Sequence, residues 1–270
     1  MVTLEEVIVV IFGLMIGSFL NVCIYRIPLD LSIILPCSFC PHCKTIIKPW
    51  ENIPVLSYIF LKGKCRHCQK KISLRYPLVE TLTAAMFLLV WFNFWTTLNS
   101  GLNFDLNLDK IILNLIFVSV LIVITFIDID HLLIHDKIIY PAMAIGVICQ
   151  LIFNQPSLLN NFIQVVLGIL VGGGIIYLFA LLGRLVFRRE AMGGGDIKLG
   201  TLIGIYLDWK MSLLSVFLAC IVGSGISLAL MGLKKKKKTD YIAFGPFLAL
   251  GAVISLFWGK RILSWYLGRW

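Results

Sequence analysis

Charged residues are scarce in this chain of 270 residues: 14% are Asp, Glu, Lys or Arg, whereas 59% are hydrophobic. Soluble domains average about 25% charged residues. Acids are the scarcer sign, with 14 against 24 basic residues and a formal net charge of +10. So few charged residues cannot cover the water-exposed surface of one or two soluble domains. So many apolar residues also exclude a disordered chain. The composition therefore indicates a polytopic helical membrane protein.

Common enzyme motifs are missing as well. The sequence contains no G-x-S-x-G serine elbow, H-E-x-x-H zinc helix, P-loop or G-x-G-x-x-G nucleotide motif. In a soluble protein the charge of +10 would suggest a nucleic-acid partner. In a membrane protein it reports topology, because cytoplasmic loops collect Lys and Arg. We therefore expect membrane lipid, and no nucleic acid, among the partners.

Long apolar runs predict the membrane spans. A spanning helix needs roughly 17–25 mostly apolar residues. The candidate runs are 6–25, 78–97, 111–127, 138–153, 162–183, 197–207, 212–232 and 241–258. The sixth run is short and the fourth lies near the lower limit. A glycine cluster at 172–174 falls inside the fifth and indicates close helix packing. The predicted fold class is all-α, a bundle of about eight spans.

Loop charges predict the orientation of this bundle. The segment 26–76 holds nine Lys or Arg and two acids, so it should be cytoplasmic and the N-terminus should lie outside. Alternation then places the basic segments 184–196 and 233–240 on the cytoplasmic side too. The C-terminal cations do not fit, because they fall outside: Lys260, Arg261 and Arg269. A short interfacial helix rich in Trp and Tyr would account for them.

The first cytoplasmic segment contains two C-x-x-C pairs. They are Cys40 with Cys43 and, after a gap, Cys65 with Cys68. Each pair can close a tight turn that presents two thiolates to one tetrahedral ion, so two pairs complete a four-sulfur site. We therefore predict a small zinc ribbon. Such a closed site is structural and does not activate water.

Other interpretations of these cysteines remain. Two disulfides or free thiols are the alternatives, and disulfides are disfavoured in the reducing cytoplasm. His42 and His67 are possible substitute ligands, whereas Cys37 lies outside the repeated spacing. Lys64 and Arg66 flank the second pair and should favour thiolates.

Two acids border predicted spans. Asp128 lies in Ile127-Asp128-Ile129-Asp130-His131 at the end of the third run, and Asp196 follows the glycines 193–195 at the start of the sixth. Carboxylates at a membrane edge are costly and usually functional. Each also has a structural explanation: an interfacial acid paired with a loop cation, and a helix cap. The glycines should allow a close helix approach and positive φ values.

Together the two acids suggest an aspartyl dyad. The predicted topology brings both to the cytoplasmic membrane face. Two neighbouring carboxyls cannot both ionise freely, so one can act as base towards water and the other as acid towards the leaving amine. This chemistry hydrolyses a peptide bond without a metal, cofactor or covalent intermediate. Asp130 is the rival for a catalytic position.

These features occur in an order that resembles the prepilin peptidase (type IV leader peptidase) family. The resemblance covers nearly the whole chain. Besides the two C-x-x-C pairs, the matching segments are Gly17–Val22, Tyr25–Pro28, Glu51–Ser57, Ile72–Glu80, Ile127–His131, the G-x-G-D motif at 193–196 and Phe244–Phe247. One departure is Ile134-His135-Asp136, where the family usually has proline in the middle position.

The resemblance implies a function and a site. Asp128 and Asp196 fall on the catalytic aspartates of the family, with Gly193, Gly195 and Lys198 as supporting motif residues. Members cut type IV prepilins and pseudopilins after the glycine of a short basic leader. Long members with both C-x-x-C pairs also N-methylate the new terminus with S-adenosylmethionine. The sequence has no recognisable motif for that cofactor, so its binding residues remain unknown.

The implied arrangement has three parts: a first span at 1–27, a cytoplasmic zinc ribbon at 28–77 and a peptidase core at 78–270. It would sit in a bacterial cytoplasmic (inner) membrane. One alternative is a non-catalytic zinc-ribbon scaffold for a pilus or secretion machine. Another is an ion-coupled carrier that uses the membrane-edge acids as a proton relay. A carrier would need inverted repeats and acids near mid-bilayer, which the sequence does not indicate.

Overall fold

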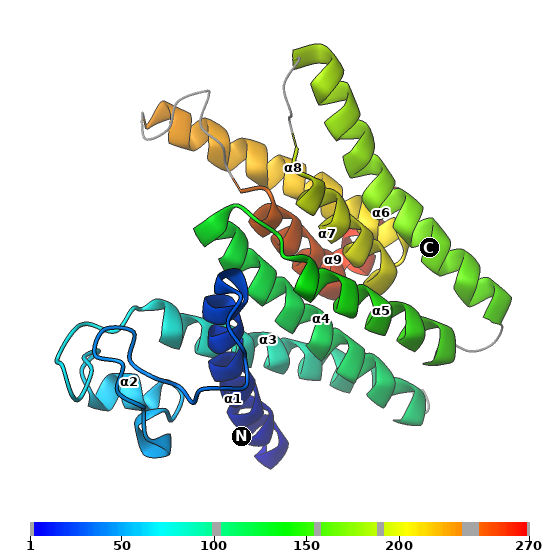
Figure 1. The fold of residues 1–270 in the computed structure, drawn as a ribbon. Coiled ribbons are helices and arrows are strands. Elements are labelled where there is room, and N and C mark those ends of the chain that lie inside the picture. The colour runs from blue at the N-terminus through cyan, green and yellow to red at the C-terminus, as the bar shows by residue number, and fades with distance from the viewer. Residues whose placement is uncertain (1–2, 99–103, 154–157, 188–191, 234–242, 269–270) are drawn as a thin grey trace. The chain divides into compact units, whose positions relative to one another are not determined.

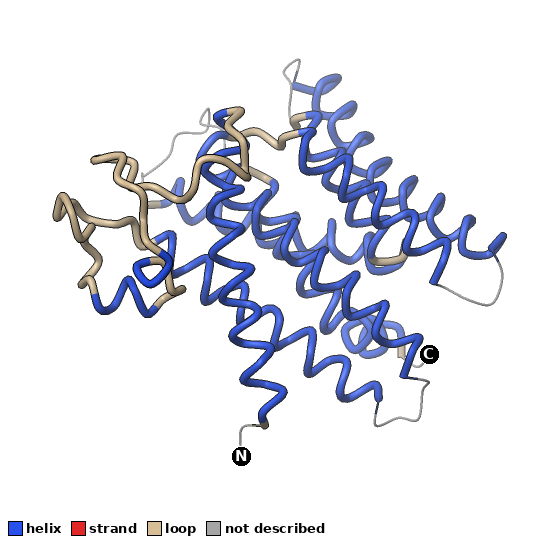
Figure 2. Tube along the Cα trace, turned by 60° about the horizontal axis from the view of Figure 1, so that its bottom comes forward, coloured by secondary structure: helices blue, strands red, loops and turns tan. Residues whose placement is uncertain are grey.

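The computed structural model describes residues 3–98, 104–153, 158–187, 192–233 and 243–268. The chain forms two compact units, residues 1–107 and 108–270. Within the described residues the regular structure is helical, and two isolated bridges are the only β pairing (Figure 2). The all-α prediction is confirmed. The lysines of the 233–240 segment lie outside the described residues.

Figure 1 shows the order of the helices. Those of unit 1 are α1 (Leu4–Arg26), α2 (Leu56–Phe60) and α3 (Arg75–Leu98), with 3-10 turns at Ile27–Leu29 and Pro49–Glu51. Helix α4 leads into unit 2, whose helices are α4 (Phe104–His131), α5 (Asp136–Phe153), α6 (Leu158–Phe187), α7 (Gly194–Tyr206), α8 (Trp209–Gly232) and α9 (Gly245–Leu267).

Six helices in the described part of the chain are long and apolar enough to cross a membrane: α1, α3, α4, α6, α8 and α9. The chain is therefore a multi-pass membrane protein. Each of the six coincides with a predicted span. The other two predicted runs are also helical, but α5 has 18 residues and α7 has 13. Helix α7 is buried along most of its length, from Leu199 to Tyr206.

The last helix differs from the prediction. Helix α9 continues without a break to Leu267, so Lys260 and Arg261 belong to it rather than to a separate interfacial helix. Burial raises the pKa of Asp208, and the charges of Lys260, Lys110 and Lys210 oppose that rise. Lys260 therefore lies near an acid at its end of the unit, which offsets the cost of placing a cation there. Residues 241–242 of the predicted run lie outside the described part.

In unit 1, α1 and α3 pack through small residues. A Cβ atom added to Gly13 would lie 2.6 Å from Ala84 Cα, and one added to Gly17 would lie 2.6 Å from Glu80 Cα. This spacing of four residues lets two membrane helices approach closely. Asn21 continues the same stripe, and its Nδ2 donates to the Tyr76 carbonyl at 3.0 Å.

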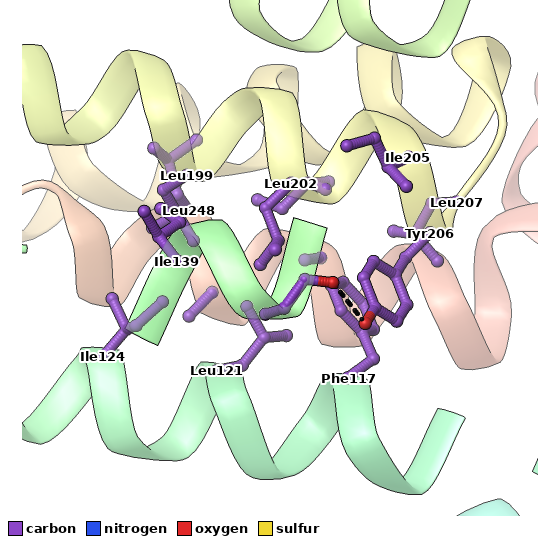
Figure 3. Close-up of a cluster of buried hydrophobic side chains, with 14 of the residues drawn as sticks. Phe117, Leu121, Ile124, Ile139, Leu199, Leu202, Ile205, Tyr206, Leu207 and Leu248 are labelled. Carbon is purple, nitrogen blue, oxygen red and sulfur yellow. Dashed lines mark hydrogen bonds between the residues drawn. The ribbon is translucent and has the colours of Figure 1, made fainter. Parts of the chain in front are cut away.

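In unit 2, α6 and α7 pack through glycines that are also spaced four residues apart, two on each helix. Gly168 faces Gly204, and Gly172 faces Gly200, with no room for a side chain at any of the four positions. Two glycines of the cluster at 172–174 thus contact α7, as predicted: Gly172 at Gly200 and Gly173 at Thr201, whereas a Cβ at Gly174 would have nothing within 4 Å. Beside it, α4, α5, α7 and α9 share an apolar core (Figure 3). Figure 3 also shows the Tyr206 hydroxyl donating to the Ala142 carbonyl at 2.9 Å.

Candidate active site and metal site

Asp128 lies in the last turn of α4, and its side chain is directed at the start of α9. The residue is 5% exposed. Its Oδ2 accepts a hydrogen bond from the backbone N–H of Gly245 at 3.0 Å, and Gly245 is the first residue of α9. Helix N-termini carry unpaired N–H groups and a partial positive charge. The buried carboxylate is therefore held by the beginning of another helix.

Gly245 has a steric reason to be glycine. A Cβ atom at this position would lie 2.5 Å from Asp128 Oδ2, which is well inside van der Waals contact. Pro246 follows in the first turn of α9, where its missing N–H has no intrahelical partner to lose. The sequence match at 244–247 thus includes Gly245, whose backbone N–H holds Asp128.

Asp196 occupies the third position of α7. It is half-buried, and the backbone N–H of Gly193, which precedes the helix, hydrogen-bonds to its carboxylate. Asp196 thus lies in the first turn of α7 as expected, but it is not the N-cap: that position is Gly193, with no side-chain cap hydrogen bond. The expected positive φ is not found either, because Gly193 has φ −75°. The close approach is found at Gly195, where an added Cβ would lie 3.0 Å from Ile134 Cβ.

Asp128, at the end of α4, lies close enough to Asp196, at the start of α7, for its charge to act on that carboxyl group. Burial first, and then the nearby charge of Asp128, raise the pKa of Asp196 to about 6, against the lowering effect of the Gly193 hydrogen bond. Asp130, two residues after Asp128, is exposed. Residues two apart on a helix point in nearly opposite directions, so only one of the two acids can face Asp196. The geometry favours Asp128 over its rival.

Lys198 lies two residues further along the same helix and joins α7 to α5. Its Nζ is 2.5 Å from Asp136 Oδ1, and it lies 5.2 Å from the centre of the Tyr140 ring. Asp136 begins α5 although His135 replaces the proline of the family. The helix therefore starts where the family pattern requires, and Lys198 links its first turn to the G-x-G-D segment.

The contact between Asp128 and Gly245 gives a direct prediction. We expect Gly245→Ala to lower the cleavage rate of a substrate by about 100-fold, because the added methyl group displaces a carboxylate that must be aligned with its target. Gly225→Ala is the matched control, since nothing lies within 4 Å of a Cβ added there. Both variants are compared for membrane insertion and for the initial rate of cleavage. Equal rates would show that the Gly245 contact does not position Asp128.

The cysteine pairs form two similar turns in unit 1. In the first, Lys44 N–H donates to Cys40 O at 2.8 Å, and an isolated bridge joins Phe39 to Ile46. In the second, Gln69 N–H donates to Cys65 O at 3.0 Å, and a bridge joins the residues 64 and 71. Lys44 and Gln69 have the same positive φ of 56°. The two turns therefore repeat one local structure.

The four thiols of these turns converge. The Sγ atoms of Cys40, Cys43, Cys65 and Cys68 all lie within 4.8 Å of one another. Cys40 Sγ and Cys68 Sγ are 3.9 Å apart. Zn–S bonds of about 2.3 Å in a tetrahedron require sulfur atoms roughly 3.8 Å apart, so the geometry fits one zinc ion. Cys37, His42 and His67 do not belong to this group.

The cause of the lowered thiol pKa values differs from the expectation. Hydrogen bonds from Thr45 lower the pKa of Cys43 to about 6, and backbone hydrogen bonds from Cys68 and His67 lower that of Cys65. The charges of Lys64 and Arg66 are not among the causes. Arg66 is instead paired with Glu51, with 3.1 Å between Nη1 and Oε1. Thr45 lies directly after the first turn, so the turn itself supplies donors to its sulfur.

The structure also gives roles to residues that sequence reasoning singled out only as parts of matching segments. Arg26 is 4% exposed, and its guanidinium donates to the carbonyls of Ser32 and Pro36 at 2.9 and 2.7 Å. It thereby fixes the segment that follows α1. Asn21 and Glu80 are buried polar residues at the contact between α1 and α3. Each is a polar side chain within an otherwise apolar stretch of sequence, and this was the signal that could have singled out both residues.

Comparison with known proteins agrees with these sites. The family model described as "Bacterial Peptidase A24 N-terminal domain" matches residues 11–94, and that of the "Type IV leader peptidase family" matches residues 115–228. No solved structure matches.

Three curated relatives carry the name "Prepilin leader peptidase/N-methyltransferase". The protein from Legionella pneumophila is 33% identical over 97% of this chain and 94% of its own length. Those from Aeromonas hydrophila and Pseudomonas aeruginosa are 35% and 32% identical, over 96% of this chain and 93% and 92% of their own lengths. With this identity over nearly its whole length, the chain belongs to the type IV leader peptidase family.

Proposed function

We propose that this chain is a membrane aspartyl endopeptidase that removes the basic leader from type IV prepilins or pseudopilins and then N-methylates the new terminus. The observation that carries the peptidase activity is the approach of Asp128 and Asp196 at one end of unit 2. Membership of the family, and the printed names of its relatives, support both activities.

In the proposed hydrolysis the two carboxyl groups share the work. The ionised one takes a proton from water while the water oxygen attacks the carbonyl carbon of the scissile bond. The protonated one gives its proton to the amide nitrogen as the C–N bond breaks. The products are a leader ending in a carboxylate and a mature chain with a free amine. No metal or covalent intermediate is needed.

The location of the acids suits a prepilin. Its leader is basic, and the segment after the cleavage site is an apolar helix that resides in the bilayer. The scissile bond therefore lies at the cytoplasmic membrane surface. The charge pattern of the loops supports the same side for the ends of α4 and α7, with the N-terminus of this chain outside.

We assign the four-cysteine site to zinc with a structural role. It would stabilise the segment 28–77, which lies between the first span at 1–27 and the peptidase core at 78–270. All four positions are thiolates, so a bound ion has no open position for water. When bound, S-adenosylmethionine would supply the methyl group for the second activity; the new amine would lose a proton, and S-adenosylhomocysteine would be the other product.

One experiment tests both activities. The purified chain in detergent is mixed with a peptide that has a short basic leader, Gly-Phe and an apolar helix, with S-adenosylmethionine present. We expect mass spectrometry to find the free leader and a mature fragment heavier by one methyl group. Without S-adenosylmethionine, cleavage should continue and the added methyl group should be absent.

The same experiment separates the alternatives. A non-catalytic scaffold would leave the peptide intact, and so would a carrier. Cleavage without methylation would retain the peptidase and exclude the second activity. An intact peptide, from a preparation that inserts correctly and binds the peptide, would overturn the proposed function.

A further inference from the structure

Unit 1 contains a cavity of about 380 Å³ beside the cysteine site. Its lining includes Asn21 and Tyr25 from α1, Tyr58 from α2, and Tyr76 and Glu80 from α3. Pockets for small organic ligands have volumes of roughly 300–1,000 Å³ and combine apolar walls with a few polar groups. All the lining residues belong to unit 1, whereas Asp128 and Asp196 belong to unit 2.

Asn21 lies in the wall of this cavity and has an unpaired polar atom. The residue is 2% exposed. Its Nδ2 donates to the carbonyls of Gly17 and Tyr76 at 3.3 and 3.0 Å. Its Oδ1 is buried and has no hydrogen-bond partner. Buried amide oxygens are rarely left unpaired, so Oδ1 can accept from a ligand that enters this wall of the cavity.

Glu80 contributes a buried acid to the same cavity. It is 7% exposed. Its Oε2 accepts from the backbone N–H of Val55 at 2.7 Å, and the hydroxyl of Ser18 also faces the carboxyl group. Both of these described partners are neutral. A buried carboxylate normally needs a cationic partner, so the part of the cavity beside Glu80 suits a positively charged group. The rest of the lining is mainly basic, so it suits a ligand that also carries an anionic group such as a carboxylate. The basic lining residues are Arg26, Arg66, Lys70, Lys71 and Arg75.

We propose that this cavity binds S-adenosylmethionine, an inference that rests on the methylation in the proposed function. The ligand carries a sulfonium and an ammonium group, which match the charge of Glu80. It also has N–H donors for Asn21 Oδ1. Tyr25, Tyr58 and Tyr76 supply aromatic faces that can stack on adenine or contact a cation.

The cysteine site forms part of the wall of this cavity. Cys40 and Cys65 are buried and belong both to the thiol cluster and to the lining. The ion that holds these two turns together would thereby also hold one side of the ligand site. A bound metal ion would therefore support methylation by shaping the ligand site, although it has no open coordination position with which to take part in the reaction.

The test measures binding rather than turnover. Labelled S-adenosylmethionine is titrated into the full chain in detergent by equilibrium dialysis. We expect Glu80→Gln to raise its Kd by tenfold or more, because the variant keeps the size and an acceptor for Val55 N–H but removes the charge. Thr83→Val is the matched control: Thr83 is 0% exposed on the same helix, and it does not line the cavity.

A second measurement does not depend on variants. Ultraviolet crosslinking of labelled S-adenosylmethionine to the wild-type chain, followed by peptide mapping, should mark residues within 18–26 or 38–80. Labelling confined to 108–270, or equal affinity of Glu80→Gln and wild type, would overturn the assignment. If both variants bind equally weakly because the fold is disturbed, the crosslinking result decides.

These results separate this inference from the proposed function. Wild-type chain that methylates the peptide but is crosslinked elsewhere would overturn only the cavity assignment. Wild-type chain that cleaves the peptide and does not bind S-adenosylmethionine would overturn the cavity assignment and the methylation together, and would leave the peptidase standing.

Discussion

Asp128→Asn and Asp196→Asn should each lower the rate of leader cleavage by about 10³-fold or more. General acid or base catalysis typically contributes 10²–10⁴-fold, and each variant removes one of two groups that act together. Asn has nearly the same size as Asp, and its amide oxygen can still accept from the Gly245 N–H that holds Asp128. The loss would therefore come from the chemistry. The measurement is the initial rate of cleavage of a leader peptide by purified, correctly inserted protein.

Asp130→Asn is the control for this pair. Asp130 lies on the same turn of α4, but it is exposed. We expect this variant to cleave at the wild-type rate and to insert as well as the other two. Cleavage at the full rate by either Asp128→Asn or Asp196→Asn would disprove the dyad. Loss of cleavage only in Asp130→Asn would transfer the role to the rival acid.

The second large effect concerns the metal. Cys65→Ser should reduce the zinc content from about one ion per chain to near zero, because three thiolates and a hydroxyl make a much weaker site. Apparent binding energies of structural zinc are about 10–16 kcal/mol at neutral pH, and they act as folding energy. The surrounding segment has little core of its own: Trp50 and Phe60 are 61% and 80% exposed. Limited proteolysis should then cut the segment 38–72 rapidly.

Cys37→Ser provides the comparison within the same segment. Cys37 is exposed and lies outside the four-thiol group. We expect this variant to keep its zinc, measured by elemental analysis, and its resistance to protease. Cys65→Ser should impair methylation more than hydrolysis, because the proposed hydrolysis uses no metal. A metal-free wild-type chain that is folded and active in both reactions would contradict the assignment.

Much of the fold follows from hydropathy. The apolar runs predict all the helices of unit 2, because a helix in a bilayer must be apolar where lipid surrounds it. The end of α9 could not be predicted in this way. Lys260 and Arg261 interrupt the apolar run, and only the structure shows that Lys260 has Asp208 nearby.

The candidate site was predictable in its residues but not in its contacts. Loop charges predict that Asp128 and Asp196 lie at the same membrane face, but they do not predict how close the helices that carry them are. The glycines before Asp196 illustrate the limit. A glycine can indicate either a positive φ or a place where a side chain would not fit. Gly195 is the second case, because Ile134 leaves too little space for a Cβ atom there.

The cavity in unit 1 was beyond sequence reasoning for a related reason. Asn21 and Glu80 are far apart in the chain, and they meet because Gly17 lets α1 approach α3. Their burial and the unpaired Oδ1 of Asn21 depend on that approach. A polar residue in an apolar run indicates that its side chain needs a hydrogen-bond partner. Only the packed structure shows which of its polar atoms has no partner within the protein.

The glycine contacts between α6 and α7 have a consequence for how this enzyme can vary. Asp196 begins a helix whose distance from its neighbour is set by Gly168, Gly172, Gly200 and Gly204, so that backbone lies directly on backbone. Mutations at these positions remove no functional group, yet each would move the carboxylate. Selection should therefore remove substitutions at these four glycines as strictly as at a catalytic aspartate. A survey of tolerated substitutions would then rank the glycines with the catalytic residues, although they carry no reactive group.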